Sequence, residues 1–346
     1  MLKKQVVFIM TDSQRQDMVG CYGNKEMFTP NLDKLASEGL RFSKAYTTQP
    51  VCGPARSALF TGLYPHSNGS WTNSYALGDN VKTIGQRLRD NGIHTAYIGK
   101  WHLDGGDYFG LGRCPDGWDA EYWYDMRNYL DEMCDEDRRW SRNTNLDQSR
   151  EVIEEFTFGH KCSDKAIKFL QNNNQEDFFI VVSYDEPHDP GLCPEPYRSM
   201  YQDYCFPKNE TVYDTLENKP GYQKVWAGNQ LKRDNDSLKI KAPNLLGCNS
   251  YIDYEIGRVI RAIEENTPDA FIIYTSDHGD FLCSHALSGK GPAGYDEITK
   301  IPLIIKGRGI KENSIYDYPV SHINLMPTIL EYMGVPIPKI LEGVSI

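Results

Sequence analysis

The sequence predicts an α/β fold in which a large, mostly parallel sheet carries helices on both faces. Short apolar runs such as 5–10 and 177–184 are typical of strands that are buried on both faces. Segments of helical periodicity alternate with these runs along the chain. Polar clusters follow several of the expected strands, and the carboxyl ends of parallel strands share one edge of a sheet, where ligands bind.

The first strand, 5–10, is a continuous apolar run that stops at polar residues. A helix is expected at 30–40, because Pro30 fits its first turn and Gly39 its end. The remaining elements are expected, in chain order, as a strand at 41–47, helices at 54–61 and 81–92, a strand at 94–99, a helix at 163–173, a strand at 177–184, a long helix at 244–266, strands at 270–276 and 301–307, and a last helix at 323–334.

Two stretches interrupt this alternation. Residues 104–160 are rich in Trp, Tyr, Asp and Arg and have weak periodicity, and residues 190–240 are also irregular. We interpret both as insertions in one α/β domain that covers residues 1–346, because neither has the pattern of a separate domain.

Composition excludes several function classes. A formal net charge of -11 argues against a nucleic-acid partner. The nine cysteines are odd in number and lack paired spacing, so neither a disulfide framework nor a structural zinc site is favoured. The apolar run near the N-terminus is too short for a signal peptide or a membrane span. We therefore expect a cytoplasmic protein that does not bind membranes.

Three residues that follow strands are candidate metal ligands: Asp12, Asp277 and His278. Carboxylates are hard oxygen donors that suit Ca²⁺, or Mg²⁺, and histidine is a less typical partner for these ions. Either aspartate could equally cap a helix or a turn.

Cationic or titratable side chains come from other segments: Arg56, Lys100, His102, His188 and Lys290. Beside a metal they would form a pocket for a doubly charged oxyanion in an otherwise acidic protein. The alternative is that the lysines are solvated and that the histidines satisfy loop carbonyls.

The stretch "PVCGPARSALFTG", residues 50–62, places Cys52 just before a helix that starts near Pro54. The positive end of the helix dipole would lower the pKa of the thiol there. A thiolate phosphatase nevertheless needs a longer loop of amides between cysteine and arginine. Only three residues separate Cys52 from Arg56, and one of them is proline, so this spacing rejects that class.

This stretch resembles the signature of the type I sulfatases of the alkaline phosphatase superfamily, in which the cysteine of Cys-x-Pro-x-Arg is oxidised to Cα-formylglycine. Further matching segments occur in the order typical of that family: "VVFIMTDSQRQD", "TPNLDKLASEG", "TGLYPHSNG", "TAYIGKWHL", "PHDP", "SDHGDFLCSH" and "GKGPAGYDEITKIPLIIKG". The resemblance therefore extends over nearly the whole chain.

The resemblance implies a formylglycine hydrate derived from Cys52 and held on a divalent metal, usually Ca²⁺, by Asp12, Asp277 and His278. One hydroxyl of this hydrate attacks the sulfur of a sulfate ester. The other hydroxyl later expels the sulfate and regenerates the aldehyde, a release route that a simple thiol lacks.

The other roles also follow from the resemblance. Arg56 and Lys100 would hold the formylglycine oxygens, His102 would act as the base, and His188 and Lys290 would contact the sulfate. The implied partners are a sulfated small molecule or oligosaccharide and a formylglycine-generating maturation enzyme.

The chain departs from the family pattern at several places. Ser13 stands where many sulfatases have a second aspartate, so Ser13, Gln14 or water would complete the metal site. This keeps a phosphodiester or phosphonate monoester hydrolase of the same superfamily as an alternative. Cys283 and Ala286 occupy positions where glycine is common in the family.

The end of the sequence is a further departure. The small C-terminal subdomain usual in sulfatases is expected to be absent, which could expose surface for self-association into a homo-oligomer. It also leaves a truncated, non-catalytic binder as a second alternative.

Overall fold

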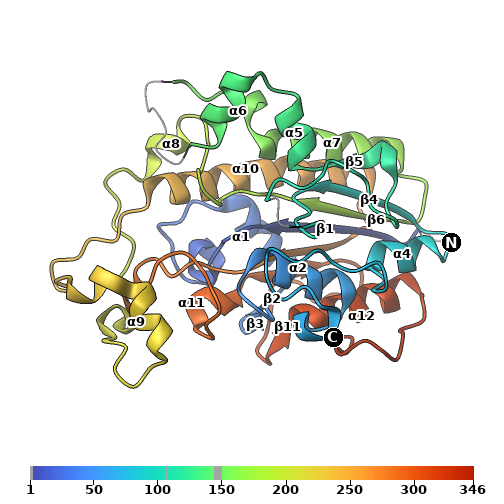
Figure 1. Ribbon diagram of the computed structural model, residues 1–346. Coiled ribbons are helices and arrows are strands. Elements are labelled where there is room, and N and C mark those ends of the chain that lie inside the picture. Colours follow the sequence, from blue (N-terminus) through green and yellow to red (C-terminus); the bar gives the residue numbers. More distant parts are fainter. Residues whose placement is uncertain (1–2, 106–107, 144–149) are drawn as a thin grey trace.

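An eight-stranded sheet forms the centre of the computed structural model, which describes residues 3–105, 108–143 and 150–346. β1 (Gln5–Thr11) lies between β6 (Phe178–Ser183) and β7 (Phe271–Ser276) and is parallel to both. β4 (His94–Gly99) continues the parallel order next to β6. The expected α/β fold with a mostly parallel sheet is confirmed (Figure 1).

The strand order is β10-β2-β9-β7-β1-β6-β4-β5. The outer strands are short: β2 (Leu40–Phe42), β5 (Trp123–Tyr124), β9 (Leu303–Lys306) and β10 (Ser314–Tyr316). β9 is antiparallel to both β7 and β2, whereas β10 is parallel to β2.

The strand expected at 41–47 is wrong as a single element. The chain enters β2, leaves it at Ser43, and then forms β3 (Ala45–Tyr46) in a separate three-stranded sheet with β8 (Lys300–Ile301) and β11 (Val320–Ser321). The backbone N of Ser43 still donates to the carbonyl O of Tyr316, the last residue of β10, at 3.1 Å. The Ser43 side chain bonds to the same place, since its Oγ donates to the Tyr316 carbonyl O at 3.3 Å and to Asp317 Oδ1. Such side-chain hydrogen bonds compete with a continuous ladder.

Helices cover both faces of the large sheet. α1 (Pro30–Ser37), α7 (Phe158–Asn172) and α10 (Pro243–Asn266) pack against one face. α2 (Cys52–Thr61), α4 (Ile84–Arg89) and α12 (His322–Met333) pack against the other face (Figure 1).

Both faces of β1 are therefore buried. Val7 and Ile9 belong to the core on the α7 side, and Val6 and Phe8 belong to the core on the α12 side. This explains why the strand reads as a continuous apolar run rather than as an alternation.

α7 begins five residues earlier than expected. The side chain of Thr157 accepts a hydrogen bond from the backbone N of His160, so Thr157 is the N-cap. The remaining short helices are α3 (Pro65–Asn68), α5 (Met126–Asp131), α6 (Asp135–Ser141), α8 (Tyr197–Met200), α9 (Gly221–Ala227) and α11 (Asp296–Thr299). The 3₁₀ turns are Gln16–Met18, Gly20–Tyr22, Ala120–Tyr122, Glu154–Phe156, Glu210–Tyr213, Gly228–Lys232 and Ser284–Ala286.

The two expected insertions contain only short elements. Residues 104–160 carry α5 and α6, and they also supply β5, which pairs with β4 and so extends the sheet. Residues 106–107 and 144–149 of that insertion lie outside the described residues. Residues 190–240 carry α8 and α9, and α9 lies away from the sheet (Figure 1). The single-domain organisation stays a prediction.

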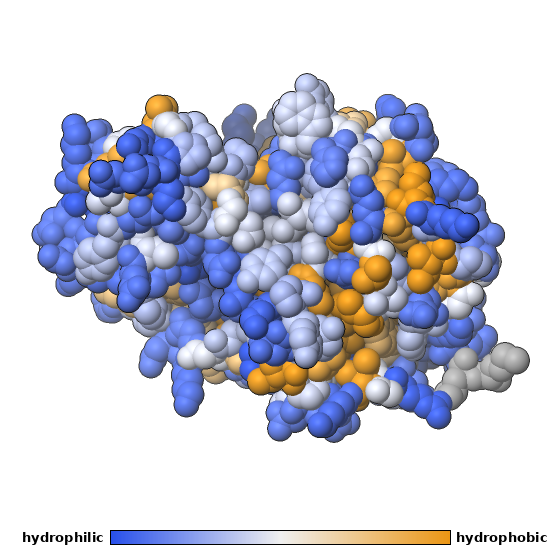
Figure 2. All heavy atoms as spheres, turned by 90° about the horizontal axis from the view of Figure 1, so that it is seen from below, coloured by the Kyte–Doolittle hydropathy of each residue, from blue (hydrophilic) through white to orange (hydrophobic). Residues whose placement is uncertain are grey.

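The segment after α12 folds back onto that helix. The carbonyl O of Val344 accepts a hydrogen bond from Asn324 Nδ2 at 2.9 Å. Glu342 accepts from the backbone N of Tyr64 at 2.6 Å and from Ser67 Oγ at 2.8 Å, which ties the segment to α3. Figure 2, which views the molecule of Figure 1 from below, shows apolar residues gathered on part of that face.

No helix within the described ranges is both long enough and apolar enough to cross a membrane.

Candidate active site

Three segments far apart in the sequence meet at the carboxyl edge of the sheet. Asp12 follows β1, Asp277 and His278 follow β7, and Cys52 is the first residue of α2. One ligand atom from each of these four residues lies within 4.8 Å of the others, and all four residues are buried. The expected convergence of the strand ends therefore exists in the structure.

The helix that carries Cys52 begins earlier than expected. α2 starts at Cys52 itself, with Val51 as N-cap, so the thiol lies in the first helical turn rather than before it. Cys52 Sγ lies 3.2 Å from His278 Nε2 and 3.8 Å from Asp12 Oδ1. Burial and Asp12 act to raise the pKa of Cys52, but Lys100, Lys290 and His278 outweigh them and lower it well below its usual value.

His278 presents one nitrogen to this group. Its Nδ1 lies 2.8 Å from the carbonyl O of Gly279, which can only accept, so Nδ1 carries the proton and donates. Nε2 faces Cys52 and Asp12, so in the neutral imidazole its lone pair points into this group, an orientation typical of a metal-ligating histidine.

The pKa values of the two aspartates are shifted in opposite directions. Burial and the charge of Asp12 raise the pKa of Asp277 to about 7. Burial would also raise the pKa of Asp12, but Lys100 and Lys290 hold it well below its usual range. A divalent cation between the carboxylates would favour their charged forms, so the donor set fits an oxygen-preferring ion.

Arg56 is fully buried beside the carboxylates. Its Nε donates to Asp277 Oδ2 at 3.0 Å, and its Nη2 lies 3.4 Å from Asp12 Oδ2. Its Nη1 donates to the carbonyl O of Lys100 at 2.6 Å and to Ser183 Oγ at 2.7 Å. The guanidinium therefore connects the ends of β1, β7, β4 and β6.

Lys100 is also fully buried and lies between two carboxylates. Its Nζ is 2.6 Å from Asp12 Oδ2 and 3.1 Å from Asp185 Oδ1. The chain reaches this position through Gly99, which has a φ of +118° and whose added Cβ would overlap the carbonyl O of Ser183. Only glycine fits there.

Asp185 and Tyr108 belong to this network but were not among the residues expected from the sequence. The hydroxyl of Tyr108 hydrogen-bonds to Asp185 Oδ1 and accepts from Lys100 Nζ at 2.9 Å. The Tyr108 ring lies edge-on to His102, with centroids 5.2 Å apart, and 5.3 Å from the His188 ring. The polar cluster after β6 could have indicated Asp185, whereas Tyr108 lies in an irregular stretch without a signal.

The remaining expected residues surround the same group. His102 is buried in a left-handed conformation, with φ 57°, and within the described part of the chain its Nδ1 has no hydrogen-bond partner. Nδ1 of His188 lies 2.9 Å from the Asp189 carbonyl O. Lys290 Nζ lies 3.4 Å from Asp12 Oδ1 and 3.0 Å from Ser13 Oγ.

Ser13 and Gln14 differ in where their side chains lie. Ser13 Oγ donates to Asp12 Oδ1 at 2.7 Å and so lies inside the group. Gln14 Nε2 donates to Asn249 Oδ1 at 2.7 Å, and its Oε1 accepts from the Tyr274 hydroxyl. The Gln14 amide is thus already hydrogen-bonded at both ends.

Cys283 and Ala286, where glycine is common in the resembled family, both have left-handed backbones. Their φ values are 71° and 54°. Glycine reaches this region without steric cost, so the structure explains the family preference, and these two side chains carry some backbone strain.

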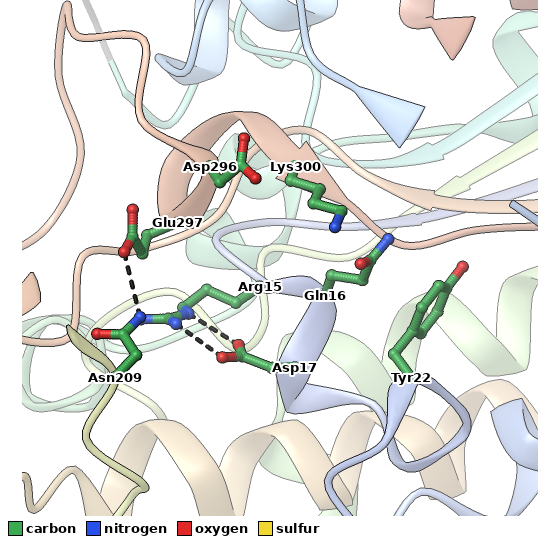
Figure 3. A pocket seen from close by; sticks show the side chains of 8 residues that line it. All are labelled: Arg15, Gln16, Asp17, Tyr22, Asn209, Asp296, Glu297 and Lys300. Atoms are coloured by element: carbon green, nitrogen blue, oxygen red, sulfur yellow. Dashed lines mark hydrogen bonds and ion pairs between the residues drawn. The ribbon is translucent and has the colours of Figure 1, made fainter. Parts of the chain in front are cut away.

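Two cavities lie near the site. One, of about 650 Å³, opens beside Ser13, His188 and Lys290. The other, of about 200 Å³, lies beyond Arg15 (Figure 3). In the second cavity Arg15 pairs with Asp17, and Glu297 accepts a hydrogen bond from Asn209 Nδ2 at 3.2 Å. The first cavity adjoins the buried Asp12–Cys52 group, because its lining residues Ser13 and Lys290 contact Asp12.

Comparisons with known proteins agree with this geometry. A sequence model of the family described as Sulfatase matches residues 4–335. The chain is 44% identical to the uncharacterized sulfatase YidJ of Escherichia coli (strain K12), over all of this chain and 71% of that protein. It is 24% identical to an N-acetylglucosamine-6-O-sulfatase of Bacteroides thetaiotaomicron, over 99% of this chain and 70% of that one.

Solved structures show the same fold. BT4656, determined with its substrate D-glucosamine-2-N,6-O-disulfate, superposes with a TM-score of 0.75 at 22% identity and covers 99% of this chain and 79% of its own. A phosphonate monoester hydrolase of Agrobacterium radiobacter superposes with a TM-score of 0.80 at 20% identity, over 99% of this chain and 76% of its own.

Proposed function

Because the chain belongs to the sulfatase family and is a sulfuric ester hydrolase, we propose that it releases sulfate from a sulfated carbohydrate, with Cys52 as the precursor of a formylglycine. The observation that carries this proposal is the position of Cys52. It begins a helix inside a buried group of two aspartates and one histidine, next to a buried arginine and lysine.

The residues present fit both implied groups. Asp12, Asp277 and His278 Nε2 would hold a divalent cation, with Ser13 Oγ as a neutral oxygen close by. We propose Ca²⁺, with Mg²⁺ as the alternative. When bound, the formylglycine hydrate and the cation supply the nucleophile and the exit route for sulfate.

The side chains around this group have separable roles. Arg56 and Lys100 contact the aspartates around Cys52 and interact electrostatically with its thiol, so they would hold the oxygens of the modified residue and stabilise negative charge on them. Lys290 and His188 line the cavity and would bind the sulfate from its open side. We assign proton uptake to His102, because its buried Nδ1 is not engaged by any described residue.

Carbohydrate is the substrate class that the relatives' names support. One relative is an N-acetylglucosamine-6-O-sulfatase and another is an ulvan-active sulfatase of Formosa agariphila. The maturation enzyme, a cytoplasmic location and self-association remain predictions.

The proposal can be tested in two steps. The protein is co-expressed with a formylglycine-generating enzyme, and the mass of the peptide that contains Cys52 is measured by mass spectrometry. We expect the mass of an aldehyde, and an unmodified thiol under these conditions would count against the proposal. The matured protein is then tested for sulfate release from a panel of sulfated mono- and disaccharides, with Cys52→Ala as the inactive control.

An aryl phosphonate is assayed in parallel. Faster turnover of the phosphonate than of the matching aryl sulfate would favour the phosphonate monoester hydrolase instead. Binding of sulfated sugars without turnover, unchanged in Cys52→Ala, would indicate a non-catalytic binder.

A further inference from the structure

The cavity beside the catalytic group has an acidic outer wall. Its volume of about 650 Å³ is in the range of small-molecule sites and accommodates a sugar residue. Lys290 forms its cationic edge next to Ser13, and His188 lines the same edge. The other lining residues are two carboxylates, an amide, a hydroxyl, a glycine and an apolar strip: Asp189, Asp280, Asn244, Ser288, Gly289, Ala242, Pro243 and Leu245.

Positive charge is therefore confined to the edge that would bind sulfate. Among the described residues that line the cavity, Lys290 is the one lysine, and no arginine is present. The part of a substrate that lies beyond its sulfate ester would face Asp189 and Asp280.

Asp189 is the stronger of these two charges. It is exposed, and within the described ranges no side chain pairs with its carboxylate. Arg142 is the cation near it. Its Nη2 lies 3.5 Å from the carbonyl O of Asp189 and forms its ion pair with Asp185 Oδ2 at 3.4 Å, not with the Asp189 carboxylate. Asp280 Oδ1, by contrast, already accepts from the backbone N of Leu282 at 2.8 Å.

The N-terminus of α10 lies in the same wall and acts in the opposite sense. Pro243 is the first residue of this helix, which has no side-chain cap, so its dipole would attract an anion. A helix end is equivalent to about half a unit charge, whereas two carboxylates carry up to two full charges. The net effect of the wall is repulsion of anions.

We propose that Asp189 is a specificity-determining residue that favours sulfate esters whose remaining groups are neutral or carry an amine, and that it disfavours substrates with a second sulfate or a carboxylate. This inference rests on the proposed sulfatase function. It predicts a preference for monosulfated neutral or amino sugars over polysulfated or uronate-containing glycans.

The test compares phenyl sulfates that carry an aminomethyl, a hydroxymethyl or a carboxylate substituent, with 4-nitrophenyl sulfate as the neutral reference. The matured wild type, Asp189→Asn and Asp189→Lys are measured by kcat/KM. The ratio of variant to wild type for each substrate cancels its intrinsic reactivity, so only the effect of the Asp189 charge remains.

We expect Asp189→Asn to raise the carboxylate-to-hydroxymethyl ratio of kcat/KM about three- to fivefold, the effect of one exposed charge pair. The aminomethyl-to-hydroxymethyl ratio should fall by a similar factor, and Asp189→Lys should extend both changes. Asp269→Asn, an exposed aspartate before the opposite end of β7, should leave all ratios unchanged.

The outcomes separate the two proposals. If no aryl sulfate is turned over by protein in which the aldehyde has been verified, the proposed function fails and this inference fails with it. If all are turned over and the ratios are the same in wild type, Asp189→Asn and Asp189→Lys, the sulfatase function stands and the role of Asp189 is refuted.

Discussion

Replacing Arg56 with methionine should destabilise the fold strongly, whether or not Cys52 is modified. The substitution keeps much of the side-chain volume but removes the guanidinium between Asp12 and Asp277, which are 3.4 and 3.0 Å from its nitrogens. All three side chains are 0% exposed, so water cannot replace the lost partner.

The size of the effect follows from these contacts. Removing one partner of a buried ion pair costs about 3–5 kcal/mol. The carbonyl O of Lys100 and Ser183 Oγ also lose a donor, but the carbonyl still accepts from the Tyr97 hydroxyl at 2.6 Å and from Ser183 Oγ at 2.9 Å, so neither group is left unsatisfied and the ion pair dominates the cost. We therefore expect Arg56→Met to lower the free energy of unfolding by about 3–5 kcal/mol, a large part of the roughly 5–15 kcal/mol of a typical domain.

The assay is equilibrium unfolding in urea in the presence of a metal chelator, monitored by tryptophan fluorescence and circular dichroism. Arg89→Met is the matched control, because Arg89 pairs with Asp116 at the surface and should cost no more than about 1 kcal/mol. Asp277→Asn in the Arg56→Met background should recover part of the loss, because it removes one of the two facing charges. A loss below about 1 kcal/mol for Arg56→Met, or equal losses for both arginines, would refute the reasoning.

Three further predictions concern single residues. Burial lowers the pKa of His322 to about 3, so below about pH 6.5 the unfolded chain binds a proton that the folded chain does not. The free energy of unfolding should therefore fall as the pH is lowered from 6.5 towards 3. Urea titrations at several pH values should show a weaker pH dependence for His322→Gln. Gly99→Ala should destabilise by several kcal/mol in thermal and urea unfolding, whereas Gly69→Ala, with φ +88° but nothing within 4 Å of its Cβ, should cost about 1–2 kcal/mol; equal costs would contradict the steric argument. Tyr108→Phe should lower kcat about tenfold and leave KM nearly unchanged, because it removes the hydroxyl that positions Lys100, and a change in KM alone would contradict this role.

The central sheet and most of the site could be predicted from the sequence. β1, β6 and β7 are buried on both faces, so their apolar runs are unambiguous, and the polar residues after them necessarily share one edge. β5 and β11 could not be predicted, because a strand of two residues has no periodicity.

Two residues of the candidate site could not be predicted for a different reason. Tyr108 reaches Lys100 from an irregular segment, and only tertiary structure brings the two together. Asp185 follows a predicted strand, but in the polar cluster there the expected site residue is His188, three residues later. The antiparallel direction of β9 was also beyond sequence patterns, since periodicity does not report strand direction.

The burial of Cys52 sets an order of events for the molecule. The residue has 0% exposure, and its sulfur is enclosed by Asp12 and His278. An enzyme that oxidises Cys52 must take the thiol into its own catalytic centre, together with the flanking backbone that forms α2 in the folded chain. If Cys52 is oxidised as proposed, its maturation would compete with folding in time, and protein that folds first would be expected to retain the thiol. The active fraction of a preparation would then report the relative rates of two processes rather than the stability of the finished fold.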